Sequence, residues 1–308
     1  MTAAVPDVAA LAARLPARPR TRFAPSPTGY LHLGHVVNAI YTWGLARALG
    51  GEVLLRIEDH DRERSRPEYV RAILDDLAWL GLEPDAAENG PVLQSDRESI
   101  YERALASLDA QGLVYACACS RREIEHASGT TGDELRYAGT CRALALPRGR
   151  GRGLRVRIDA GAEVFDDALM GRQEQHPIGQ TGDLLIRDRV GQWMYQFAVT
   201  VDDMEQQVDL VIRGVDLLAS TGRQTRLARL LGRPTPPVFL HHPLLFSRPG
   251  VKLSKSNRET GLRELRAAGA SSADVLGLAA TRCGLLDAAR PIRVSDLPAL
   301  FPYPVTRP

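Results

Sequence analysis

Two histidines and a glycine lie close together in RFAPSPTGYLHLGH, the segment from Arg22 to His35. Its PSPTG portion predicts a turn, and the apolar run that follows has helical spacing. A helix start presents unpaired N–H groups and a partial positive charge, so it suits phosphate. On that first turn His32 and His35 would share a face and donate to developing phosphate charge, and Gly34 would leave room for a nucleotide. A helix-capping loop with two exposed histidines has the same spacing, so both interpretations stay open.

A second basic segment, PGVKLSKSNRETG, contains two lysines on either side of a serine. Lys252 and Lys255 in a glycine-adjacent loop suggest a flexible phosphate clamp. A basic loop alone is a weak signal, because such loops are usually only solvated. Together, the two segments suggest a site for the phosphates of a nucleotide.

The elements around the first segment predict how it is positioned. A short strand over 21–24, a turn, a helix over 35–49 ended by two glycines, and a buried strand over 53–59 form a βαβ unit. Such units build parallel sheets, whose ligands bind beyond the carboxyl ends of the strands. We therefore expect Arg22, the histidines and Glu58 to face one crevice.

Further patterns extend this α/β organisation along the chain. We expect helices over 66–82, 99–111, 221–231 and 261–286. Strand character marks DLLIRDR, WMYQFAVTVDD and VDLVIRGVD, whereas the arginine-rich LPRGRGRGLRVRI has the composition of a loop.

Composition excludes several classes of protein. The 308 residues are 44% hydrophobic and 25% charged with a net charge of +2, which is ordinary for a soluble globular chain, and any RNA-binding surface must be a local patch. No apolar run reaches the roughly 18 residues of a membrane span, and the N-terminus does not resemble a secretory signal. Four cysteines do not make a disulfide framework. We expect a cytoplasmic monomer with no membrane contact.

Taken as a pair, PSPTGYLHLGH and KLSKS resemble the two signatures of class I aminoacyl-tRNA synthetases, with Leu253 where methionine is usual. RFAPSPTG, LLRIEDHD, WMYQFAVTVDD and VIRGVDLLASTGRQ resemble the glutamyl and glutaminyl branch, and the similarity runs from about residue 21 to about residue 258. The chain length, the cysteine spacing CAC…YAGTC and the KLSKSN wording are similar to a truncated paralogue family, the glutamyl-queuosine tRNA(Asp) synthetases.

The resemblance implies a fold and its division along the chain. The expected fold is α/β, with a Rossmann-type parallel-sheet catalytic domain split by a zinc-containing insertion, a short helical C-terminal region and no anticodon-binding domain. The expected parts are an N-terminal tail (1–20), the first half of the Rossmann domain (21–95), the insertion with an acceptor-type subdomain (96–180), the second Rossmann half (181–245), and the KLSKS loop with the helical region (246–308).

The same resemblance implies an activity. The enzyme would be an ATP-dependent ligase that activates L-glutamate without tRNA and esterifies it to the queuosine base at the wobble position of tRNA(Asp). Three other interpretations remain: an ordinary glutamyl-tRNA synthetase that charges a tRNA 3′ end, a non-catalytic RNA-binding module, and a nucleotidyltransferase. The last gives no reason for the set of Arg22, Glu58 and Arg213.

Site residues follow from the matched motifs. The glutamate-binding set is Arg22, Phe23, Ala24, Pro25, Ser26, Glu58, Tyr195 and Arg213. The ATP-binding set is His32, Gly34, His35, Lys252 and Lys255, of which His32, His35 and Lys255 are the catalytic residues. Mg²⁺ would accompany ATP and be held by phosphates and water, without an assigned protein ligand.

Three cysteines suggest one structural zinc ion. Cys117, Cys119 and Cys141 are soft ligands in a chain without a disulfide framework, and structural zinc needs four ligands. Ligand chemistry alone favours His126 as the fourth, whereas the paralogue pattern implies Tyr137, which we follow. Loss of the metal, with free thiols, is the remaining interpretation.

An arginine cluster follows the metal segment. Its members are Arg142, Arg148, Arg150, Arg152, Arg155 and Arg157. They could bind RNA phosphates, or they could form only a solvated loop.

Overall fold

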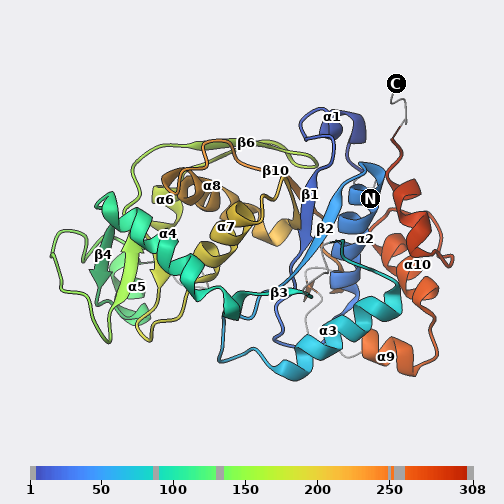
Figure 1. Ribbon diagram of the computed structural model, residues 1–308, viewed down its shortest axis with the longest axis horizontal. Helices are drawn as coiled ribbons and strands as arrows, with labels where there is room; N and C mark the ends of the chain where they lie inside the picture. Colours follow the sequence, from blue (N-terminus) through green and yellow to red (C-terminus); the bar gives the residue numbers. More distant parts are fainter. Residues whose placement is uncertain (1–4, 86–89, 130–134, 249–250, 253–260, 304–308) are drawn as a thin grey trace.

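A parallel sheet built from two separate parts of the chain forms the centre of the protein (Figure 1). The structure is a computed structural model that describes residues 5–85, 90–129, 135–248, 251–252 and 261–303. The first part supplies β1 (Arg20–Phe23), β2 (Glu52–Ile57) and β3 (Val92–Leu93), which pair in parallel in that order. The expected βαβ start and parallel sheet are confirmed.

The second part supplies the other half of the sheet. Its strands are β9 (Leu210–Gly214), β10 (Val238–His242), β6 (Glu163–Asp167) and β7 (Gly171–Gln175). Strand β10 is parallel to both β9 and β6, and β7 closes the edge as an antiparallel partner of β6. The amide of Asp209 donates to the carbonyl of Arg20 at 2.9 Å, so β9 lies beside β1 and the two halves meet.

Helix α2 (Leu33–Ala48) connects β1 to β2 and is buried around most of its surface. Ile40, Tyr41 and Leu45 are fully buried. A Cβ atom on Gly44 would lie 2.4 Å from the ring of Phe301, so only glycine admits this close contact. Through it the C-terminal 3₁₀ helix η4 (Val294–Leu300) packs directly on α2.

The remaining helices surround the sheet. They are α1 (Val8–Ala12), α3 (Pro67–Leu80), η1 (Gln94–Asp96), α4 (Glu98–Ala110), α7 (Tyr195–Glu205), η2 (Val215–Ser220), α8 (Thr221–Leu230), α9 (Leu262–Ala267) and α10 (Ser272–Arg282). The expected helices over 66–82, 99–111 and 221–231 are confirmed, and the one over 261–286 is divided into α9 and α10. No helix among the described residues is long and apolar enough to span a membrane.

The strand expected for WMYQFAVTVDD is wrong, because this segment contains helix α7. Every residue from Phe197 to Asp203 is buried. A short apolar run with β-branched residues fits a buried strand or a helix buried on all sides, and here tertiary burial decides the outcome. Tyr195 therefore lies in the first turn of a helix and not in the interior of a strand.

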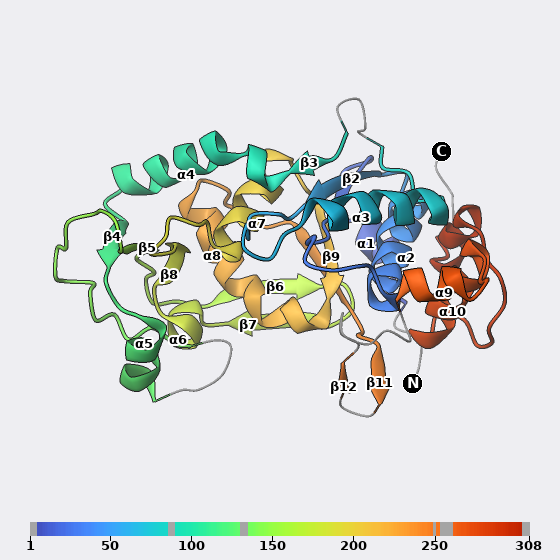
Figure 2. The same ribbon diagram turned by 90° about the horizontal axis from the view of Figure 1, so that it is seen from below.

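The insertion forms a separate lobe at one end of the molecule, opposite α9 and α10 (Figures 1 and 2). Its antiparallel sheet contains β4 (Val114–Cys117), β5 (Gly153–Val156) and β8 (Leu184–Arg187), with α5 (Arg121–Ser128) and α6 (Pro177–Thr181) nearby. Three placements differ from expectation. The arginine-rich loop contains β5, and β8 pairs with the insertion although it follows the expected boundary at residue 181. The β6–β7 hairpin, inside the expected insertion, returns to the main sheet.

A candidate active site at the carboxyl ends of the parallel strands

One cleft of about 570 Å³ opens where β1, β2 and β9 end. The turn after β1, the start of α2 and the start of α7 complete its wall. The predicted residues that line it are Arg22, Phe23, Ala24, Pro25, Ser26, His32, Gly34, His35, Glu58, Tyr195 and Arg213. The structure therefore brings together all the predicted glutamate- and ATP-site residues whose side chains it describes.

Both histidines cap helix α2. His32 is the N-cap residue, and its Nδ1 accepts from the amide of Gly34 at 3.0 Å, while Nδ1 of His35 accepts from the amide of His32 at 3.1 Å. A neutral ring that accepts at Nδ1 carries its proton on Nε2, so each imidazole keeps a donor at the other nitrogen. Capping and ligand donation, the two interpretations of this segment, are thus compatible in the same side chains.

Gly34 has a second reason to lack a side chain. A Cβ atom there would lie 2.9 Å from Cε1 of His32, so glycine lets the capping ring lie on the helix start. The two imidazole centroids are 4.0 Å apart. The absence of a side chain at Gly34, expected to make room for a nucleotide, thus also makes room for the His32 ring that caps the helix.

The lysine segment begins and ends beside this cleft. Leu245 lines the cleft just before β11 (Phe246–Arg248) and β12 (Val251–Lys252), and Gly261 forms a β-bridge with His32. The amide of Leu262 donates to the carbonyl of Leu31 at 3.0 Å. The side chain of Lys252 and all of Lys255 lie outside the described residues, so their assignment stays a prediction.

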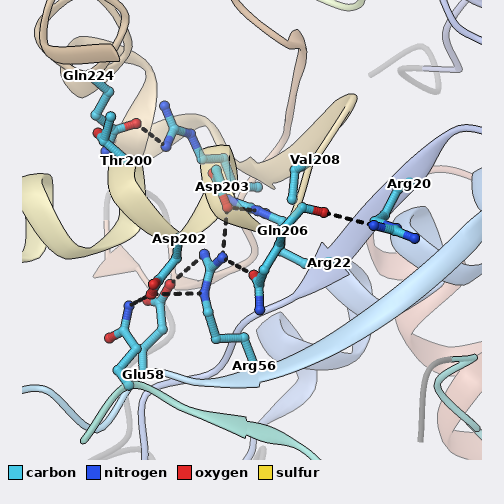
Figure 3. A network of polar contacts seen from close by, with 12 residues as sticks. Arg20, Arg22, Arg56, Glu58, Thr200, Asp202, Asp203, Gln206, Val208 and Gln224 are labelled. Carbon is cyan, nitrogen blue, oxygen red and sulfur yellow. Dashed lines mark hydrogen bonds and ion pairs between the residues drawn. The ribbon is translucent and has the colours of Figure 1, made fainter. Parts of the chain in front are cut away.

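A buried ionic network lies beneath the cleft (Figure 3). Oδ1 of Asp203 accepts from Nε of Arg22 at 2.9 Å and from Nη1 of Arg56 at 2.8 Å. Nη2 of Arg56 lies 3.1 Å from Oε1 of Glu58. Arg56 is therefore an ion-pair partner of Glu58, whose carboxylate also lines the cleft. Helix α7 contributes Asp203, so the corrected element positions this network.

Burial and charge set the protonation of the network. Burial raises the pKa of Asp203, but the cations of Arg22 and Arg56 outweigh it and hold the pKa at about 2. Burial raises the pKa of Glu58 although Arg56 and Arg22 oppose the shift. Burial and the charge of Glu58 raise the pKa of Tyr195 to about 12. The cleft thus has a Tyr195 hydroxyl that stays protonated at neutral pH beside a desolvated carboxylate.

Asp202, which the sequence did not single out, forms a second set of buried hydrogen bonds in the same region. Its carboxylate is fully buried and accepts from Gln94 at 2.6 Å, Arg97 at 2.6 Å and Tyr101 at 2.9 Å. Gln94 in turn bonds Nδ1 of His60 at 2.6 Å. The sequence does contain a signal for this network: Asp202 and Asp203 follow an apolar run, and carboxylates buried with such a run require polar partners.

Three neutral groups accept hydrogen bonds from Arg213. It donates to Nε2 of His241 at 2.9 Å, to Oε1 of Gln224 at 2.7 Å and to Oγ1 of Thr221 at 2.8 Å. Among the described residues, no carboxylate lies within ion-pair distance of this guanidinium, which is 4% exposed. Burial lowers the pKa of Arg213. A buried cation with neutral partners favours an anionic ligand.

His241 and Asp167 hold Arg213 in place and were also missed. Nδ1 of His241 lies 2.6 Å from Oδ2 of Asp167, and both side chains are fully buried. Burial lowers the pKa of His241 even though Asp167 raises it. Donation from Nδ1 to Asp167 leaves Nε2 as an acceptor for Arg213, so the neutral tautomer fits both partners.

The three cysteines of the insertion form one cluster. Sγ atoms of Cys117, Cys119 and Cys141 all lie within 4.8 Å of one another, and those of Cys119 and Cys141 are 3.5 Å apart. The hydroxyl of Tyr137 lies 3.5 Å from Sγ of Cys117 and accepts from the amide of Cys141 at 2.7 Å. His126 is exposed on α5 and does not belong to the cluster. The donor set is three thiols with a phenol beside them.

The predicted arginine cluster separates into two groups. Arg155 and Arg157 stack on the rings of Tyr137 and Tyr115 at 3.7 and 4.8 Å, and Arg142 pairs with Asp183 at 3.2 Å. These three brace the insertion. The other three, Arg148, Arg150 and Arg152, line a surface cavity.

Comparison with known proteins identifies the family of the chain. Residues 19–276 match the family of class I tRNA synthetases (E and Q), catalytic domain. Curated relatives named glutamyl-Q tRNA(Asp) synthetase are 41% identical in Nitratidesulfovibrio vulgaris, over 87% of each chain, and 42% identical in Symbiobacterium thermophilum, over 91% of each chain. These matches confirm the resemblance carried by the motifs.

A solved structure agrees on the fold. The crystal structure of a glutamate tRNA ligase from Elizabethkingia meningosepticum, in complex with its amino acid, superposes with a TM-score of 0.76 at 25% identity. The alignment covers 91% of this chain and 64% of that one. The α/β fold is therefore that of a class I synthetase catalytic domain, and the chain belongs to the glutamyl-Q tRNA(Asp) synthetase family.

Proposed function

We propose that the protein activates L-glutamate with ATP in the absence of tRNA and transfers the glutamyl group to the queuosine base at the wobble position of tRNA(Asp). The names of relatives more than 40% identical support this substrate pair. Transfer to a tRNA 3′ end is the alternative within the class, and these relatives do not favour it. A tRNA substrate is also consistent with the expected cytoplasmic location.

The observation that carries the proposal is the charge pattern of the cleft. Arg213 is a buried cation with neutral partners, and Glu58 is a buried carboxylate on the same wall. Glutamate supplies complementary groups: its side-chain carboxylate for Arg213 and its ammonium for Glu58. The remaining guanidinium N–H groups of Arg22 would bind a carboxylate, and Tyr195 would donate its hydroxyl. The segment Phe23–Ser26 would form the pocket floor.

Activation needs no general base, because the α-carboxylate is already ionised. A carboxylate oxygen attacks the α-phosphorus in line, the new O–P bond forms, and the bond to pyrophosphate breaks. His32 and His35 would donate from Nε2 to the triphosphate, and Lys252 and Lys255 would neutralise the leaving pyrophosphate. Mg²⁺ bound to ATP would add further neutralisation through its phosphates.

Transfer completes the reaction on the RNA. A hydroxyl of the queuosine cis-diol attacks the carbonyl carbon of glutamyl-adenylate, an ester bond forms, and the carbonyl–oxygen bond to AMP breaks. The hydroxyl proton passes to water or to the phosphate of the departing AMP, which leaves as an anion. The position of the adenylate in the cleft would decide which hydroxyl reaches the carbonyl.

The cysteine cluster fits a structural metal ion. Tetrahedral zinc with Zn–S bonds of about 2.3 Å separates its sulfur ligands by about 3.8 Å. The observed 3.5 Å between the sulfurs of Cys119 and Cys141 is close to this value. Cys117, Cys119, Cys141 and the Tyr137 hydroxyl would hold Zn²⁺, which would brace the insertion and take no part in activation.

Charging bulk tRNA with labelled glutamate tests the proposal. Label should appear on tRNA(Asp) alone and on its wobble nucleotide, and periodate oxidation of the queuosine cis-diol should abolish it. Label on a terminal ribose would instead identify a 3′-end synthetase. Absence of glutamate-dependent ATP–pyrophosphate exchange would leave only RNA binding.

A further inference from the structure

A groove on the insertion lobe concentrates positive charge outside the cleft. Its cavity of about 650 Å³ lies between the loop before β5 and the loop after β8. Five arginines line it: Arg148, Arg150, Arg152, Arg187 and Arg189. We call this surface the arginine groove.

The groove is held together by contacts between its two loops. Nε of Arg189 donates to the carbonyl of Gly151 at 3.0 Å. Asp188 is the acidic residue of the lining. Its carboxylate accepts from the amides of Val190 at 2.9 Å and Gln192 at 2.8 Å and so stabilises the turn after β8. The remaining charge of the lining is positive.

The arginines of the groove differ in how strongly they are held by contacts with other residues. Arg148 pairs with Asp109, and Arg187 lies 2.8 Å from Glu102. In contrast, Arg150 is exposed and makes no hydrogen bond or ion pair with a described residue. Arg189 is exposed as well, and its Nε donates to a backbone carbonyl. Arg150 and Arg189 thus keep most of their N–H groups for an anionic ligand.

The groove leads toward the active site. A neighbouring cavity of about 380 Å³ shares Arg187, Val190 and Gly191 with the groove and is lined by His60 on its other side. The ring of His60 lies 6.0 Å from that of Tyr195, which lines the cleft. Groove, second cavity and cleft therefore follow one another across the surface.

We propose that the arginine groove binds the phosphate backbone of the RNA arm whose base enters the cleft. The inference rests on the proposed function, which places an RNA base at the cleft. Guanidinium groups recognise phosphates by charge-assisted, bidentate hydrogen bonds, and the glycines at 149 and 151 leave open space for a close backbone approach. An extended row of cations suits a polyanion better than a single small anion. Base reading is not assigned to these residues, because phosphate contacts position an RNA without specifying its sequence.

The test compares two charge-matched double variants. Arg150→Ala/Arg189→Ala removes two cations of the groove, and Arg71→Ala/Arg290→Ala removes two exposed cations outside the insertion lobe, one in α3 and one after α10. Each is assayed for binding of a tRNA(Asp) transcript across a salt series, for transfer to queuosine-containing tRNA(Asp), and for glutamate-dependent ATP–pyrophosphate exchange without tRNA.

The groove variant should lower kcat/KM for transfer at least tenfold and reduce the steepness of log Kd against log salt by about 1.5, since each lost phosphate contact removes roughly 0.7–0.9. Its pyrophosphate exchange should stay within twofold, and the control should match the wild type in all assays. Equal losses in both variants, or an unchanged salt slope, would overturn the proposal. Arg150→Glu, at an exposed side chain that makes no hydrogen bond or ion pair with a described residue, repeats the test with little expected effect on folding. Failure of the proposed function would appear separately, as absent exchange or a 3′-end product in the wild type.

Discussion

The cleft and the arginine groove both depend on arginine, but they use it in opposite ways. In the cleft, Arg22 and Arg213 are each 4% exposed and their guanidinium groups are fixed by Asp203, or by His241 and its neighbours. In the groove, Arg150 and Arg189 are exposed and loosely held. A fixed, desolvated cation recognises the shape of its ligand, whereas an exposed one recognises charge and is screened by salt.

This contrast predicts how sensitive each region is to small changes. A buried guanidinium cannot be replaced by another cation without leaving acceptors unsatisfied. An exposed guanidinium contributes mainly its charge. Glutamate-dependent pyrophosphate exchange needs no tRNA in the proposed mechanism, so its rate reports on the cleft alone. The size of the change in this rate allows the following variants to be compared.

The largest effect is expected at the helix cap. His35→Ala should lower pyrophosphate exchange roughly 10²–10³-fold, because it removes a donor to the developing phosphate charge. His35→Asn keeps a side-chain oxygen that can cap α2, so it should recover thermal stability but not activity. Near-wild-type exchange in either variant would refute the assignment.

A smaller effect is expected at Arg213. Arg213→Lys keeps the charge but cannot reach Gln224, Thr221 and His241 together, so the KM for glutamate should rise about 30-fold, equivalent to roughly 2 kcal/mol. Steady-state exchange kinetics measure it. Arg150→Lys is the matched control in the groove and should stay within twofold in both exchange and transfer. Similar responses at the two positions would remove the distinction between the regions.

The pH dependence of glutamate use should reflect Glu58. Burial raises its pKa above the ordinary value of 4.5, and only the carboxylate attracts the substrate ammonium. As pH falls through this raised pKa, kcat/KM for glutamate should decline, approaching tenfold per pH unit on the acid side. Exchange at saturating ATP gives the profile. Glu58→Gln should lower the plateau and flatten this limb, and an unchanged acid limb in that variant would assign it to another group.

The smallest effect on exchange is expected from the cysteine cluster. Cys119→Ser should reduce bound zinc from one equivalent to below half and lower the thermal stability of the insertion, while exchange stays within twofold. Transfer to tRNA should fall, because the cluster and the arginine groove belong to the same lobe. Metal analysis together with the two assays separates these effects. A wild-type protein with less than half an equivalent of zinc would contradict the metal assignment.

Sequence reasoning succeeded where local chemistry and chain order were sufficient. The turn, the helix with its two histidines and the following strand formed as expected, because turn residues and apolar spacing act locally. The convergence of Arg22, Glu58 and Arg213 also followed, since strand ends meet at one edge of a parallel sheet.

It failed where long-range packing decides the structure. Helix α7 was expected as a strand, and the partners of Arg213 come from α8 and β10, which no local spacing connects to β9. The arginine cluster was read as one surface, although Arg155 and Arg157 stack on tyrosines brought in from Tyr137 and Tyr115. Pairings of this kind depend on which elements meet in three dimensions.

The contact between Gly44 and Phe301 links the C-terminal end of the chain to the helix that begins at the two imidazoles. The same helix that carries the imidazoles at its start is supported along its back by η4, more than 250 positions later in the sequence. Shortening the protein before Leu297, or attaching a bulky tag that displaces this support, would uncover an apolar helix surface and disturb the register of the two rings. Expression vectors for this enzyme should therefore place added residues at the opposite terminus.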